Sequence, residues 1–128
     1  MASINWEYYG SLKTDITEQA TFERVCKLAE GKLNAFTHFR AKRFLDAYDE
    51  TSATDFENQV HAQIQQTMCE LVSAMYLMES NGMGTGVTSV SNDGYSESYK
   101  VTTVAEREEQ LLSIVRNGLS GTGLAGVL

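Results

Sequence analysis

"TDFENQVHAQIQQTMCELVSAMYLMES", residues 54–80, is the longest run of helical periodicity in the chain. Its apolar side chains recur every three or four residues over about seven turns, which predicts one long amphipathic helix. These side chains are Phe56, Val60, Ile64, Met68, Leu71, Val72, Met75 and Met78. Ser52 or Thr54 can cap its start. The glycine-rich "NGMGTG", residues 81–86, ends it.

A first helix is expected upstream, within "TDITEQATFERVCKLAEGKL". Asp15 followed three residues later by Glu18 fits a capping box, and Thr17 is the rival cap. Helical spacing then defines one apolar face, which predicts the side that packs on the core. That face comprises Phe22, Val25, Cys26, Ala29, Leu33 and Phe36.

A break is expected near the end of this first helix. Gly31 and Asn34 both weaken the helical pattern, which favours a turn into a second helix, residues 38–49, with Thr37 as its cap. The second helix carries a basic cluster of Arg40, Lys42 and Arg43. Such a cluster is most often a solvated face. The alternative is a charge contact with another subunit.

Residues 81–102 predict a β-hairpin between the last two helices. "NDG" at residues 92–94 supplies side chains that tolerate positive φ, which is a strong hairpin signal. A three-residue loop places Val87, Tyr95 and Tyr99 on one face of the ribbon. A lone two-stranded ribbon is only marginally stable in water. We therefore expect it to pack against the helices or against another chain.

A last helix is expected from a capping box of Thr103 and Glu106 to Gly118. Its inward residues are predicted to be Leu111, Leu112, Val115 and Leu119. An extended tail, residues 119–128, follows it. The tail is rich in glycine and apolar residues and has no charged side chain. It is too apolar for a disordered end, so we expect something to cover it.

Composition limits the classes of function. The 128 residues are enough for a single domain, and 42% of them are apolar and 21% charged. The net charge of −7 argues against a non-specific grip on nucleic acid or anionic lipid. The first residues lack a basic start and an apolar run, and no apolar stretch nears the roughly 18 residues of a membrane span. We expect a soluble protein made in a cytoplasm.

The sequence contains no convincing catalytic, cofactor or metal motif. Gly121, Gly123 and Gly126 formally match the dinucleotide-binding fingerprint, but they follow a helix where that motif follows a strand. The histidines, His38 and His61, have no metal-ligand spacing around them. Cys26 and Cys69 lie on or beside apolar helix stripes, which predicts buried free thiols. We expect no enzyme activity, no cofactor and no metal.

Taken in order, these segments resemble the head-tail connector, or adaptor, proteins of tailed bacteriophages. The resemblance covers nearly the whole chain, and "LSGTGL" at residues 119–124 is its most specific stretch. The segments that carry it are "WEYYG", "FERVCKLAEGKLNAFTHFR", "QVHAQIQQTMCELVSAMYLMESNG", "VTSVSNDGYSESY" and "IVRNGLSGTGLAGVL". The expected fold is mainly α: a small bundle of about four helices with a hairpin between the last two and an extended tail.

The resemblance implies a structural protein of the virion neck, made in the host cytoplasm. Its copies would be monomers in isolation and would form a homo-oligomeric ring, usually a dodecamer, when they dock under the portal protein. The ring would join the portal to a stopper or tail-completion protein. The ring would line the DNA channel without binding DNA specifically. A small acidic helical protein-interaction module, or a DNA-mimic inhibitor, is the alternative.

The residues expected to make these contacts fall in three groups. The portal-binding group is Leu119, Gly121, Gly123, Leu124, Gly126, Val127 and Leu128. The group expected to contact a neighbouring subunit or the neck is Val90, Asn92, Asp93, Gly94, Tyr95 and Tyr99. The group expected to make charge contacts between subunits is Arg40, Lys42 and Arg43.

Overall fold

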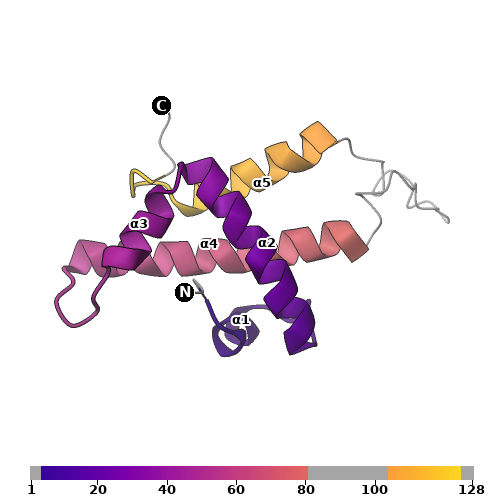
Figure 1. Cartoon of the computed structure of the whole chain (residues 1–128), viewed down its shortest axis with the longest axis horizontal. Coiled ribbons are helices and arrows are strands. Elements are labelled where there is room, and N and C mark those ends of the chain that lie inside the picture. Colours follow the sequence, from indigo (N-terminus) through magenta and orange to yellow (C-terminus); the bar gives the residue numbers. More distant parts are fainter. Residues whose placement is uncertain (1–3, 81–103, 125–128) are drawn as a thin grey trace.

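The computed structural model describes residues 4–80 and 104–124, and within these ranges it contains five helices and no strand (Figure 1). The helices are α1 (Trp6–Leu12), α2 (Gln19–Thr37), α3 (Arg40–Ala47), α4 (Asp55–Ser80) and α5 (Val104–Gly118). The prediction of a mainly α protein is confirmed. The predicted hairpin, residues 81–102, lies outside the described residues.

The central helix α4 organises the bundle. In Figure 1, α2 crosses α4 and α5 runs beside it, while α1 lies on the side of α4 away from α5. Most of the predicted stripe of α4 is buried, and Met75 and Met78 pack partly buried against the core. Phe56 was predicted to face the core, and that prediction is wrong: its side chain is 56% exposed, because no described residue covers that side of the first turn.

Helix α4 begins with a capping box. The hydroxyl of Thr54 accepts a hydrogen bond from the backbone N–H of Glu57 at 3.1 Å, and the Glu57 carboxylate accepts one from the N–H of Thr54 at 2.9 Å. Two backbone donors that the helix cannot use are thereby satisfied. Of the two predicted caps, Thr54 is the one used.

Helix α1 was not predicted, because a helix of seven residues has little stability of its own. Asn5 caps it by accepting a hydrogen bond from the N–H of Tyr8 at 2.7 Å. Tyr9 is fully buried and holds α1 on the core through its hydroxyl, which lies 2.8 Å from the Ser73 hydroxyl of α4. Tertiary contacts therefore make this segment helical.

The start of α2 also differs from the prediction. The helix begins at Gln19, and Glu18 occupies the cap position without a side-chain hydrogen bond to the backbone, so capping by Asp15 or Thr17 is wrong. Ile16, just upstream, is buried in the core. Burying Ile16 holds the chain extended in front of the helix and delays the first turn.

The turn between α2 and α3 lies at His38 and Phe39, later than predicted. Both residues have positive φ, 54° and 64°, and the N–H of Phe39 reaches back to the carbonyl of Asn34 at 2.8 Å, as in a Schellman motif. The prediction that Thr37 caps the second helix is wrong: Thr37 is the last residue of α2, and Phe39 occupies the cap position of α3 without a side-chain hydrogen bond. The Thr37 hydroxyl still accepts a hydrogen bond from the N–H of Ala41 at 3.3 Å.

Helix α5 ends at Gly118, as predicted. Leu111 and Val115 are buried as expected, whereas Leu112 is only half-buried. The predicted cap Thr103 lies outside the described residues. Among the described residues, no helix combines the length and the apolarity that a membrane crossing requires.

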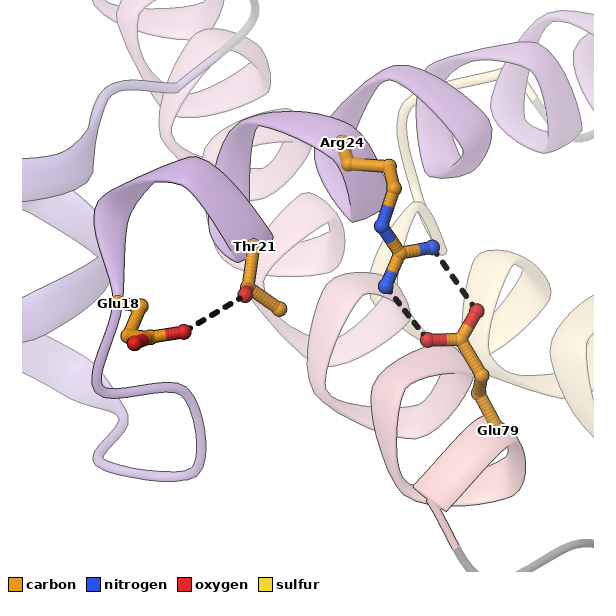
Figure 2. A network of polar contacts seen from close by, with 4 residues as sticks. All are labelled: Glu18, Thr21, Arg24 and Glu79. Atoms are coloured by element: carbon orange, nitrogen blue, oxygen red, sulfur yellow. Dashed lines mark hydrogen bonds and ion pairs between the residues drawn. The ribbon is translucent and has the colours of Figure 1, made fainter.

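An exposed ion pair links α2 to α4. Figure 2 shows the guanidinium of Arg24 donating two hydrogen bonds to the carboxylate of Glu79, at 3.0 Å and 2.6 Å, beside the weaker contact of Thr21 with Glu18. The hydrogen bonds from Arg24 lower the pKa of Glu79 below its ordinary value of 4.5. Folding therefore gains from ionised Glu79 above its unfolded-state pKa and loses this contribution as the pH falls through its lower folded-state pKa.

We expect Arg24→Gln to raise the pKa of Glu79 back toward 4.5, because the two charge-assisted hydrogen bonds are lost. A carboxyl titration followed by NMR measures this shift. The pKa of Asp46, which is lowered by its hydrogen bond from Lys42, serves as the control and stays unchanged. An unaltered pKa of Glu79 in the variant would contradict the assignment.

Candidate functional site

The described part of the predicted tail, residues 119–124, is folded into turns, so an extended tail beginning at residue 119 is wrong. Gly121 and Gly123 have φ of 83° and 80°, in the region that glycine tolerates best. Between them the Thr122 hydroxyl donates to the Leu119 carbonyl at 2.6 Å and accepts from the N–H of Leu124 at 3.1 Å. Glycine placement and one threonine thus shape this C-terminal turn, residues 119–124.

The C-terminal turn is attached to α4. Leu119 is 1% exposed and belongs to the core, and Leu124 packs partly buried against it. The amide of Gln63 donates to the carbonyl of Gly118 at 3.1 Å and to that of Ser120 at 3.0 Å. Leu119 therefore packs inside its own chain and is not an exposed anchor for a partner, which corrects its assignment to the portal-binding group. Exposed Gly121 and Gly123 remain accessible.

The predicted basic cluster lies at the junction of α2 and α3, here called the basic corner (residues 38–43). Each cation has a local contact. Arg40 donates to the carbonyl of Thr37 at 3.1 Å, Arg43 to that of His38 at 3.4 Å, and Lys42 pairs with Asp46 at 2.9 Å. Phe39 is 53% exposed beside them. These contacts fit a solvated face, and a charge contact with another subunit stays a prediction.

The fold brings the C-terminal turn and the basic corner to one side of the molecule. In Figure 1 the turn after α5 and the junction of α2 with α3 both lie there, whereas the end of α4 and the start of α5 lie at the opposite edge. The two segments are about 80 positions apart in the sequence, so no local pattern predicts that they lie on the same side. The packing of α2 and α5 on α4 brings both segments to this side.

A groove of about 420 Å³ lies between α1 and α2. Trp6, Phe22 and Cys26 line it together with polar residues of α2. Both cysteines are free and buried, as predicted, and burial raises the pKa of Cys26 to about 12 and that of Cys69 to about 11. Such thiols are protonated at neutral pH and are poor nucleophiles. The described residues also contain no cluster of three potential metal ligands.

The chain matches no known protein-family model, no curated protein and no solved structure. The expectation of an adaptor protein therefore depends on the order of motifs along the chain and on the surfaces of its own bundle.

Several predicted contact residues lie outside the described ranges. They are Val90, Asn92, Asp93, Gly94, Tyr95, Tyr99, Gly126, Val127 and Leu128. Conversely, sequence reasoning missed Phe39 and Gln63. An aromatic residue directly before a basic run is the only local signal for Phe39, and nothing local marks Gln63, whose partners are 55 and 57 positions away.

Proposed function

We propose that this protein is a neck adaptor of a tailed bacteriophage, forming a homo-oligomeric ring under the portal protein and joining it to a stopper or tail-completion protein. The observation that carries the proposal is the meeting of the C-terminal turn and the basic corner on one side of the bundle (Figure 1). One face then offers an apolar, glycine-rich segment and cations to a single large partner.

The C-terminal turn is suited to present the residues that follow it. Its backbone is held by Gln63, and Leu124 packs at the margin of the core. A partner therefore does not have to order this part of the chain on binding, which lowers the entropic cost. Ala125 and the three residues after it, with Gly126, Val127 and Leu128 as proposed anchors, can add as a strand or lie in a groove of the portal.

The opposite edge of the bundle suits a second contact. The predicted hairpin joins the end of α4 to the start of α5, and both of these ends lie away from the C-terminal turn (Figure 1). A ribbon placed there would meet a neighbouring subunit or the next neck component. The net charge of −7 per copy supports a channel that DNA slides through without binding.

The test is binding to the portal protein encoded in the same genome. We expect truncation after Leu124 to weaken this binding at least about tenfold, equivalent to about 1.4 kcal/mol. The helical circular dichroism and the thermal midpoint should not change, because every core residue of the described chain precedes residue 125. Affinity is measured by surface plasmon resonance on immobilised portal, and ring formation by negative-stain imaging.

Leu12→Ser is the matched control for the truncation. It removes an exposed leucine from α1, on the side of α4 away from the C-terminal turn, and should leave portal affinity unchanged. Equal affinity of the truncated and full chains would reject the tail as the portal-binding segment. Absence of any complex with the full chain, even at large excess, would reject the adaptor function and favour the alternative of an acidic interaction module.

A further inference from the structure

We propose that neighbouring copies of this chain contact each other head to tail through two oppositely charged aromatic patches at the two ends of α3. The positive patch is the basic corner with Phe39. The negative patch, residues 49–57, comprises the loop after α3 and the first turn of α4, with Phe56. The inference deepens the proposed function and rests on it, because a ring requires one contact repeated between all copies.

The positive patch combines backbone strain with an exposed aromatic ring. Phe39 adopts φ of 64°, a conformation that costs a side chain with a Cβ about 1–2 kcal/mol. More than half of its surface is exposed, so packing inside the described chain recovers little of this cost. Three cations and no carboxylate accompany it between residues 38 and 43. A partner that covers Phe39 and supplies carboxylates would bury the exposed ring and pair with the cations.

The negative patch has the matching composition. Residues 49–57 contain four carboxylates and no cation, and all four carboxylates are exposed. Hydrogen bonds from Thr51 lower the pKa of Asp49, which keeps this group ionised. Asp55 forms no ion pair with any described residue, and Glu50 interacts electrostatically with His61 without forming an ion pair. Phe56, 56% exposed, supplies the apolar part of the patch.

The two patches are complementary between copies and not within one. Residues 44–48 separate the two patches along the chain, and the last four residues of α3 among them span about 6 Å at 1.5 Å per residue. Within the positive patch, Lys42 already pairs with Asp46 of the same helix. A second copy of this chain would therefore supply both the carboxylates and the exposed aromatic ring that the positive patch can bind. A contact between two different patches propagates and closes into a ring when the rotation permits.

Crosslinking between two single-cysteine variants tests the contact. Arg43→Cys and Glu50→Cys chains, one of them tagged, are mixed and treated with a short bis-maleimide. We expect the mixture to give about tenfold more crosslinked heterodimer than a control mixture of Lys27→Cys with Glu50→Cys, the ratio for a contact about 1.4 kcal/mol more favourable. Lys27 is an exposed cation of α2 outside both patches. The native thiols are buried and react slowly.

Two further readouts separate this contact from random collision. Raising the salt from 0.1 M to 1 M shortens the screening length from about 10 Å to about 3 Å and should abolish the excess heterodimer. Adding Phe39→Ser to the Arg43→Cys chain should reduce it severalfold. Equal yields in the test and control mixtures would overturn the proposal. So would efficient homodimers of Arg43→Cys alone, which indicate a symmetric contact.

The outcomes are independent of portal binding. A chain that binds the portal without the crosslink retains the adaptor function and loses this subunit contact. A chain that gives the crosslink but never binds the portal retains the contact and loses the adaptor function.

Discussion

Replacing Tyr9 by alanine is expected to lower the free energy of unfolding by about 3–5 kcal/mol, the range for truncating a buried aromatic residue. The side chain is fully buried between α1, α2 and α4. Its ring lies 5.1 Å from that of Phe22 and 6.2 Å from that of Trp6, measured between centroids. Alanine at residue 9 would leave a cavity and an unpaired Ser73 hydroxyl, and α1 would lose its anchor. Urea denaturation followed by circular dichroism measures the loss.

Two further variants separate the contributions of the ring, the hydroxyl and the helix to this loss of stability. Tyr9→Phe keeps the ring and removes only the hydrogen bond with Ser73, so we expect a loss of about 1 kcal/mol. Leu12→Ala truncates an exposed residue of the same helix and should change stability by less than about 0.5 kcal/mol. If Tyr9→Ala unfolds at the same urea concentration as the native chain, α1 contributes no global stability and the expectation fails.

Replacing Gly118 by alanine is expected to lower the free energy of unfolding by about 3 kcal/mol, at the upper end of the range for overpacking. A Cβ atom at this position would lie 2.0 Å from the hydroxyl oxygen of Thr67 and 3.0 Å from its Cβ. Thr67 is 1% exposed on α4, so its side chain is already packed by its neighbours. The better helix propensity of alanine, about 1 kcal/mol, does not offset this clash. Thermal and urea unfolding both measure the effect.

The clash can be isolated with a control glycine and a double mutant. Gly31 lies in α2, and a methyl group added there would meet nothing within 4 Å, so Gly31→Ala should stabilise the protein by about 0.5–1 kcal/mol. Thr67→Ala removes the nearest atom, and Gly118→Ala should then cost at least about 1 kcal/mol less than in the native background. An identical cost in both backgrounds would show that the contact with Thr67 is not the cause.

Gly118 also explains how the C-terminal turn is held against α4. Without a side chain at this position, α5 approaches α4 closely enough for Gln63 to bind the carbonyls of Gly118 and Ser120. The only buried side-chain oxygen without a hydrogen-bond partner among the described residues is that of Thr67, which packs against Gly118. The two helices thus pack closely at Gly118 although the Thr67 hydroxyl is left without a hydrogen bond.

Helical periodicity and local chain signals predicted several features correctly. The long helix α4, the end of α5 at Gly118 and the buried free cysteines all follow from helical spacing and from glycine as a helix terminator. The cap at Thr54 follows from local chemistry too, since its partner Glu57 is three residues away. Each of these predictions uses a pattern within a short stretch of sequence.

The tertiary structure decided what depends on contacts far apart in sequence. Helix α1 forms because Tyr9 meets Ser73, 64 positions away, and the C-terminal turn is held because Gln63 meets Gly118, 55 positions away. Phe56 continues the apolar stripe of α4 and is still exposed, because spacing indicates a face and cannot indicate whether another element covers it. Helical spacing is enough to predict most of the helices and their apolar faces, whereas the packing of α2 and α5 on α4 sets which segments share a surface.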